Sequence, residues 1–316
     1  MSSSAATAAG VWRETPLLIE RGPERLFAIV CEPAAAPAAI GVLIVVGGPQ
    51  YRAGSHRQFV LLSRALAARG IAALRLDTTG MGDSTGALAD FQATGADIAA
   101  ALQAFRRMRP ETPQFYLAGL CDGASALLLA LEQADLRAAV TGLCLINPWV
   151  RSEDSLATAT VTTYYRRRLL SADFWARLAR GSLRLGTLRK AAGLVGQALR
   201  SRVAGPAPTT PFIQRMAGAL GGFDGRVLFV LSRRDFVADE FRHSFAQRPE
   251  WQAARQRTAL HQTLDFDTDH TFSDPRAGEQ LQAAVADWLL GAHAAAAPLP
   301  GRPFPSTLDR MQTHEA

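Results

Sequence analysis

The sequence predicts an α/β protein built on a mostly parallel β-sheet, with helices covering both of its faces. Short apolar runs alternate with stretches whose apolar residues recur at helical spacing, and this alternation is typical of strands joined by crossover helices. The 316 residues are 48% hydrophobic and 20% charged, which is enough apolar material for one large domain with insertions. We therefore expect a ligand site at the carboxyl ends of the strands.

The expected strands are apolar runs bounded by turn residues. Residues 17–19 and 26–31 are predicted to form an early hairpin, with Arg21, Gly22 and Pro23 at its turn. The remaining strands are expected at residues 40–46, 71–76, 115–118, 139–146, 227–231 and 259–266.

Helices are expected between these strands and at the end of the sheet. Their apolar positions recur over residues 59–66, 98–108, 124–131 and 276–290. Residues 149–222 separate two strands by far more than a crossover needs and contain helical apolar stripes of their own. We expect residues 14–148 and 223–291 to form the α/β core, residues 149–222 to form a helical cap over the site, and residues 1–13 and 292–316 to be disordered.

The net charge of +6 is unevenly distributed, because residues 151–202 in the predicted cap hold eleven basic and three acidic residues. No nucleic-acid-binding motif accompanies them, so nucleic acid is not an expected partner. The basic residues either make peripheral contact with an anionic membrane or form a solvated helix face. In the first case each arginine near the membrane could contribute about 1 kcal/mol to binding.

The cysteine count and the apolar runs bear on the compartment. Three widely spaced cysteines fit neither a disulfide framework nor a metal cluster. No run reaches the roughly 18 apolar residues of a membrane span, and no secretory signal is recognisable. We expect a cytoplasmic protein, or one peripheral to the inner membrane, that uses no metal or other cofactor.

A turn between a predicted strand and a predicted helix carries the main chemical signal. Residues 119–123 read Gly-Leu-Cys-Asp-Gly, a G-x-nucleophile-x-G elbow with Cys121 at its centre. The glycines allow a tight turn that raises the central side chain above the sheet edge, and a thiol beside a helix N-terminus tends to ionise. The alternative is that Cys121 is a small buried hydrophobe.

The partners of a nucleophilic cysteine are expected on later loops, an acid first and a histidine last. Among the six histidines, His270 follows the last predicted strand and is the candidate base; a surface histidine is the alternative. Asp235 emerges from the strand at 227–231 and is the candidate acid, preferred over Asp239, which is expected to cap the next helix. Asp235 would orient the imidazole and stabilise its charged form.

An oxyanion site needs two N–H donors beside the nucleophile. The backbone of Asp122 is expected to supply one, and the loop at residues 47–52 the other, through Gly48 or, preferably, Gln50 because Pro49 has no N–H. Arg52, His56 and Arg57, at the end of this loop and just after it, are candidate substrate contacts that would attract an anionic group, or are simply surface charges.

Four motifs together resemble a known family. They are residues 47–52 (Gly-Gly-Pro-Gln-Tyr-Arg), 55–58 (Ser-His-Arg-Gln), 119–125 (Gly-Leu-Cys-Asp-Gly-Ala-Ser) and 269–273 (Asp-His-Thr-Phe-Ser). This combination resembles the α/β-hydrolases of the exosortase A system-associated type 1 family, with similarity over residues 16–290. The resemblance implies an α/β-hydrolase fold and a setting beside bacterial protein-sorting and exopolysaccharide genes. Residues 77–84 match a turn that braces loops in such folds.

The resemblance and the motifs together predict acyl transfer. Cysteine replaces the serine of most α/β-hydrolases, as in dienelactone hydrolases, which implies activated esters, lactones or thioesters as substrates. The expected function is hydrolysis of a small acyl ester or thioester through an acyl-enzyme intermediate on Cys121, with His270 and Asp235. The alternatives are an acyltransferase to a sugar hydroxyl and a non-catalytic protein that docks to a membrane or partner.

Overall fold

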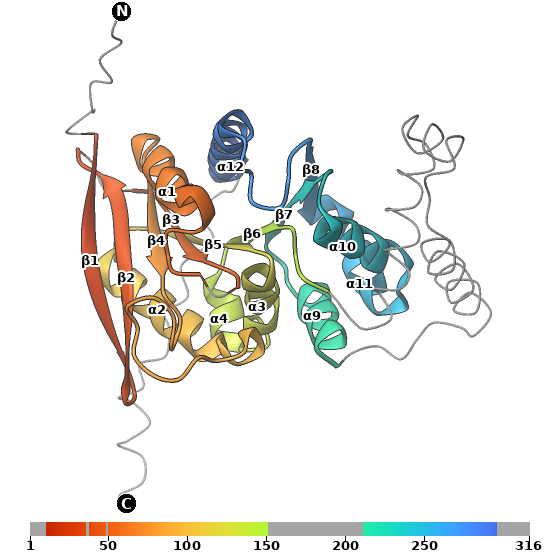
Figure 1. Ribbon diagram of the computed structural model, residues 1–316, viewed down its shortest axis with the longest axis horizontal. Coiled ribbons are helices and arrows are strands. Elements are labelled where there is room, and N and C mark those ends of the chain that lie inside the picture. The colour runs from red at the N-terminus through yellow and green to blue at the C-terminus, as the bar shows by residue number, and fades with distance from the viewer. Residues whose placement is uncertain (1–10, 36–37, 49, 151–210, 296–316) are drawn as a thin grey trace, which may run out of the picture.

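A single mixed sheet runs through the molecule. The computed structural model describes residues 11–35, 38–48, 50–150 and 211–295 (Figure 1). Its eight strands lie in the order β1-β2-β4-β3-β5-β6-β7-β8. The bounds are β1 Trp12–Arg21, β2 Glu24–Pro33, β3 Ile40–Val45, β4 Ile71–Leu76, β5 Gln114–Leu120, β6 Gly142–Ile146, β7 Arg226–Ser232 and β8 His261–Phe266. Strands β3 to β8 pair with one another in parallel, whereas β1 pairs antiparallel with β2 and β2 pairs antiparallel with β4, so the predicted mostly parallel sheet is confirmed.

Helices cover both faces of this sheet, as predicted. The described α-helices are α1 Gln58–Ala68, α2 Gly95–Met108, α3 Asp122–Ala130, α4 Ala134–Ala139, α9 Pro211–Gly221, α10 Phe236–Gln247, α11 Gln252–Arg255 and α12 Pro275–Ala295. Helices α1 and α12 lie on one face, and α2, α3, α4 and α9 on the other (Figure 1). Two apolar cores result, one on each side of the sheet.

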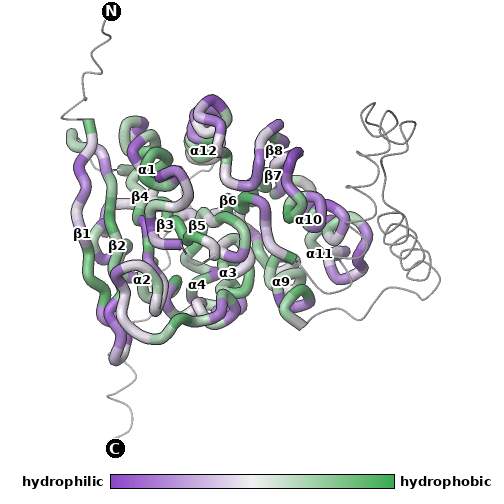
Figure 2. Tube along the Cα trace, in the orientation of Figure 1, coloured by the Kyte–Doolittle hydropathy of each residue, from purple (hydrophilic) through white to green (hydrophobic). Residues whose placement is uncertain are grey.

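Burial follows position in the sheet. Every residue of β3, β4, β5 and β6 is buried, as is usual for parallel strands covered on both faces. The end strand β8 has no buried residue, and Figure 2 shows its hydrophilic positions beside the more hydrophobic centre. Apolar runs in the sequence therefore predict the central strands well and the strands at the ends of the sheet less well.

Several boundaries differ from the sequence prediction. The hairpin strands β1 and β2 are ten residues each, because antiparallel pairing with a partly exposed face does not require a continuous apolar run. Strand β6 begins at Gly142 rather than at residue 139, since the preceding residues form α4. Helix α12 continues to Ala295, past the predicted end at residue 290.

Most of the predicted cap, residues 151–210, lies outside the described residues. The last part of the predicted cap, Pro211–Gly221, forms α9. This helix buries Ile213, Met216 and Leu220 and packs against α3 and α11. Within the described ranges, no helix combines the length and apolar character needed to cross a bilayer.

Candidate active site

The turn between β5 and α3 holds Cys121 in a strained backbone conformation. Its φ of 60° and ψ of −128° are rare for a residue with a side chain and cost about 1–3 kcal/mol. Hydrogen bonds on both sides stabilise the turn: Cys121 N–H donates to Ile146 O at 2.9 Å, and Cys121 O accepts from Ser125 and Trp149 N–H, each at 3.2 Å. The half-buried thiol therefore lies at the carboxyl edge of the sheet, at the N-terminus of α3.

The two glycines of the elbow are required by close backbone approach. A Cβ atom on Gly119 would lie 2.9 Å from the N atom of Ala124, and one on Gly123 would lie 2.7 Å from Val45 O. Neither backbone atom can move far, because one belongs to α3 and the other to the end of β3. These contacts give the physical reason for the glycine spacing seen in the sequence.

His270 and Asp235 meet beside this elbow. Asp235 directly follows β7 at the N-cap of α10, where its carboxylate accepts from the N–H groups of Val237 and Ala238 at 3.1 and 3.2 Å. The same carboxylate lies 2.7 Å from Nδ1 of His270, on the loop after β8. The cap holds the acid in place, and the acid in turn orients the ring.

The other side of the His270 ring faces the thiol. Cys121 lies close enough to the His270 side chain to raise its pKa, and Asp235 already occupies Nδ1, so Nε2 is the nitrogen available to the sulfur. Burial alone would lower the pKa of His270, but the hydrogen bonds and charges of Asp235 and Cys121 raise it to about 10. The structure thus brings the three predicted triad residues together in the order thiol, imidazole, carboxylate.

Asp239, the alternative acid in the sequence, lies one turn further along α10. Its carboxylate pairs with Arg242 at 2.9 Å. Ser125, the nearest serine along the elbow, is fully buried and donates to Trp149 O at 2.6 Å.

Asn147 was missed by the sequence analysis, although it directly follows β6 at the same sheet edge as the triad. It is fully buried with a φ of 44°. Its side-chain amide donates to His270 O at 3.1 Å and to Ser232 Oγ at 3.0 Å, and its Oδ1 accepts from Ser232 N–H at 2.8 Å. A polar residue directly after a buried strand was the signal that could have indicated this position.

A hydrogen bond joins the two segments that were expected to supply the oxyanion donors. Gly48 N–H donates to Oδ1 of Asp122 at 2.5 Å, whereas Gln50 N–H donates back to Gly48 O at 2.8 Å in a tight turn. Gly48 therefore faces the elbow, and the structure favours it as the loop donor over Gln50, which we preferred from the sequence. Burial raises the pKa of Asp122, opposed by hydrogen bonds from the N–H groups of Gly48, Gly123 and Asp122 itself.

The three basic residues near this loop differ in their surroundings. Arg52 pairs with Asp77 and Asp83, and its guanidinium lies 4.4 Å from the centre of the Phe27 ring. With only 13% of its side chain exposed, Arg52 is held as a brace for the turn at residues 77–84, which disfavours the substrate contact expected from the sequence. His56 and Arg57 are exposed, both with left-handed backbone conformations.

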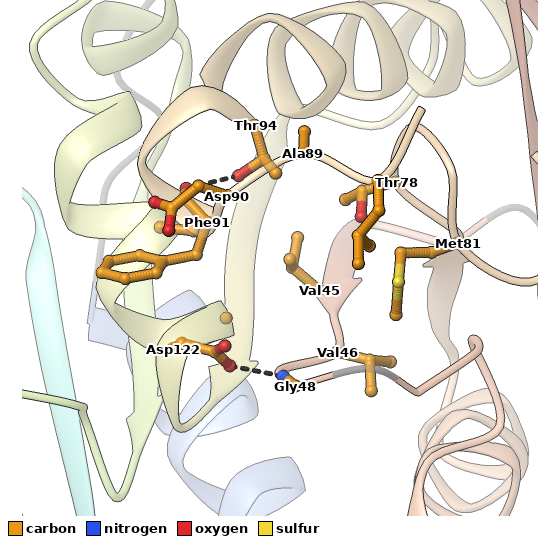
Figure 3. Close-up of a pocket in the computed structure, with 13 residues that line it drawn as sticks. Val45, Val46, Gly48, Thr78, Met81, Ala89, Asp90, Phe91, Thr94 and Asp122 are labelled. Carbon is orange, nitrogen blue, oxygen red and sulfur yellow. Dashed lines mark hydrogen bonds between the residues drawn. The ribbon is translucent and has the colours of Figure 1, made fainter. Parts of the chain in front are cut away.

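A pocket of about 480 Å³ opens beside the elbow (Figure 3). Its walls come from the ends of β3 and β4, the loop before α2, and the start of α3. Most lining side chains are apolar, including Val45, Met81 and Phe91, while Asp90 and Asp122 contribute carboxylates. It meets the elbow through Asp122 and Gly123, and neither Cys121 nor His270 is among its lining residues.

Comparisons with known proteins bear on the fold. A family model described as serine aminopeptidase, S33, matches residues 39–183, somewhat less than half of the chain. Among solved structures, an esterase, Pf2001, from Pyrococcus furiosus superposes with a TM-score of 0.59 at 12% identity, over 89% of this chain and 93% of that one. No curated protein matches the sequence significantly.

Two further structures extend the likeness. Est1E from Butyrivibrio proteoclasticus, solved with ferulic acid bound, has a TM-score of 0.57 at 15% identity, over 88% of this chain and 99% of that one. A proline iminopeptidase from Mycobacterium smegmatis has a TM-score of 0.55 at 18% identity, over 90% of this chain and all of that one, 100%. At identities this low, the structural similarity shows the fold alone, which is the α/β-hydrolase fold.

The sheet order and the elbow after β5 agree with the likeness to these solved structures. The chain has the α/β-hydrolase fold, and residues 39–183 match the family model described as serine aminopeptidase, S33.

Proposed function

We propose that this protein is a carboxylic ester or thioester hydrolase that works through Cys121, His270 and Asp235. The observation that carries the proposal is the convergence of these side chains at one edge of the sheet, with Asp235 2.7 Å from the ring whose other nitrogen faces the thiol. They come from three separate loops, after β5, β7 and β8. A packing role for the cysteine alone would not require a charged partner for the histidine.

The electrostatics support a cysteine nucleophile. With a pKa of about 10, His270 keeps its proton at neutral pH, which places a positive charge beside the sulfur. The N-terminus of α3 adds a partial positive charge on the other side. Positive charge placed beside a sulfur in this way is typical of nucleophilic cysteines.

The reaction follows from this arrangement. Cys121 Sγ forms a bond to the acyl carbon as the C=O π electrons move to oxygen, and backbone N–H groups at the elbow stabilise that oxyanion. The tetrahedral species collapses, the C–O or C–S bond to the leaving group breaks, and His270 gives its proton to the departing atom. Water then loses a proton to His270 and attacks the acyl-enzyme, which releases the acid and restores the thiolate. Asp235 stabilises the charged ring and keeps its proton-bearing nitrogen fixed.

The similar structures include esterases and a peptidase, and the matching family model is named for a serine enzyme. We favour esters and thioesters over amides because a thiolate leaves a tetrahedral intermediate more readily than an amine does, so an amide substrate would tend to revert. The motif resemblance to the exosortase-associated type 1 hydrolases supports a proposed role beside bacterial exopolysaccharide synthesis and a small acyl substrate from that setting.

The test is turnover of p-nitrophenyl butyrate and a butyryl thioester by the wild type, Cys121→Ala and Cys144→Ala. Cys144 is a matched control, because it is also a free cysteine but is buried in β6 on the core side. Activity that disappears in Cys121→Ala and persists in folded Cys144→Ala supports the proposal. Equal activity in all three proteins contradicts it. A sugar acceptor that diverts product from acid to ester would identify acyl transfer to a hydroxyl in place of hydrolysis.

A further inference from the structure

The side chain of Asp122 occupies the place where an acyl oxyanion should bind. The two expected oxyanion donors are the backbone N–H groups of Gly48 and Asp122. Gly48 N–H donates to Oδ1 of the Asp122 side chain, and the backbone of Asp122 also helps to stabilise this carboxylate. The contact from Gly48 is short, at 2.5 Å, and joins two segments 74 residues apart in the sequence. Figure 3 shows this carboxylate pointing across the elbow to Gly48.

A carboxylate resembles an oxyanion in charge and in the hydrogen bonds it accepts. The donors that stabilise one will therefore also bind the other, and they cannot serve both at once. The N–H of Gly123 adds a further hydrogen bond to the same carboxylate. Whatever substrate oxygen enters has to compete with a side chain that is already in place.

The structure also offers a place for the displaced side chain. Asp122 lines the pocket of about 480 Å³, so a rotation about its side-chain bonds moves the carboxylate from the donors into open space without moving α3. Exposed Asp90 lines the same pocket, so the displaced carboxylate approaches a like charge. That repulsion favours the closed position, in which the carboxylate remains on the donors.

We propose that Asp122 is an internal occupant of the oxyanion site, which holds the site closed until the acyl oxygen of a substrate displaces its carboxylate into the neighbouring pocket. The inference rests on the proposed function, since it presupposes that Cys121 attacks a carbonyl. Asp122 thereby limits the affinity of the site for any ligand whose oxygen needs both donors. Reactions of the thiol that develop no oxyanion are unaffected by it.

Two reagents separate these cases in the full-length protein. Butanal adds to Cys121 when a bond forms between Sγ and the carbonyl carbon, and its C=O becomes an oxygen that needs the donors. Iodoacetamide alkylates Sγ with loss of iodide and forms no oxyanion. A substitution that changes the dissociation constant of butanal but not the rate of alkylation therefore acts on the oxyanion site.

In Asp122→Ala the backbone donors remain but the occupant is gone. We expect butanal to bind about tenfold more tightly, the size of one charge-assisted hydrogen bond no longer in competition, with little change in the alkylation rate. Asp122→Asn should give a smaller gain, because a neutral amide oxygen still competes but more weakly. Asp135→Ala on α4 removes an exposed carboxylate far from the elbow and should change neither quantity.

The outcomes discriminate between this inference and a purely structural one. If Asp122 served only to tie the β3 loop to α3, Asp122→Ala would bind butanal equally or more weakly, which would overturn the inference while alkylation of Cys121 continued. Should that variant fail to fold, a crystal structure of the wild-type butanal adduct decides: the carboxylate has to have left Gly48, and a carboxylate still on both donors refutes the idea. Wild-type Cys121 that reacts with neither reagent would overturn the proposed function and this inference with it.

Discussion

Asp235→Asn is the change that tests the site most directly, because asparagine keeps the shape of the side chain and removes its charge. The carboxylate lies 2.7 Å from Nδ1 of His270 and is 6% exposed, so solvent screens the pair little. Removing an opposite charge this close lowers a pKa by about 1–3 in comparable settings, so that of His270 should fall from about 10 to roughly 7–9. That change corresponds to about 1–4 kcal/mol of interaction with the charged ring.

The catalytic effect should be larger than the effect on folding. An asparagine amide donates a hydrogen bond where the carboxylate only accepts, so it favours the wrong imidazole tautomer and leaves no acid for the leaving group and no base for water. We expect kcat/KM for p-nitrophenyl butyrate to fall by about 10²–10⁴-fold. Asparagine is as good an N-cap as aspartate, so the cap of α10 should be kept and any fall in melting temperature should reflect only the lost interaction with the charged ring.

The matched control is Asp239→Asn, which removes a carboxylate one turn further along the same helix. Its partner is Arg242, so we expect kcat/KM to stay close to that of the wild type. NMR titration of the His270 ring in each protein measures the pKa directly. If Asp235→Asn retained nearly full activity while Asp239→Asn lost it, the assignment of the acid would be wrong.

Four other outcomes follow from the structure. Cys121→Ala should abolish ester hydrolysis with little change in the melting temperature, since alanine keeps the Cβ atom and the strained turn is the same in both proteins; turnover at the wild-type rate would refute the nucleophile. Asn147→Leu should destabilise the fold by about 2–4 kcal/mol in urea titrations, because it leaves partners in the His270 loop unpaired, and unchanged stability would count against that network. Arg52→Leu leaves the buried carboxylate of Asp77 without its partner and should cost about 3–5 kcal/mol; a loss of substrate affinity with no loss of stability would instead restore a substrate contact. The pKa of His270 is raised in the folded protein, so the stability of the wild type relative to His270→Gln should be greatest below about pH 6.5 and decline as pH rises through about 10. Denaturation series at several pH values that show the opposite trend would contradict the ion pair.

Much of the site was readable from local sequence. Cys121 is marked by the glycines on either side of it, whose spacing reflects close contacts with α3 and β3. Asp235 and His270 each follow a strand at the edge where parallel strands end, so their positions along the chain already predicted that they would converge. Their distances and the pKa of His270 depend on how the loops after β7 and β8 fold, which no local pattern specifies.

The oxyanion loop shows where such reasoning stops. Glycine and proline mark a turn at residues 47–52 but do not say in which direction each N–H points. Gly48, with a φ of 68°, turns its N–H toward Asp122, while the N–H of Gln50 is used within the turn. The partner of Gly48 lies 74 residues away, so the preference for Gln50 could not be corrected before the two segments were seen together.

The amino-acid sequence by itself determined the alternation of strands and helices, the elbow at Cys121 and the chain order of the candidate triad, because backbone propensity and apolar periodicity act over a few residues. Tertiary structure alone decided that Arg52 braces Asp77, that Asn147 holds the loop of His270, and that the Asp122 side chain accepts from Gly48 N–H. Each of these depends on polar groups from distant segments that are buried together, where every donor and acceptor needs a partner and the packed fold determines which one is within reach.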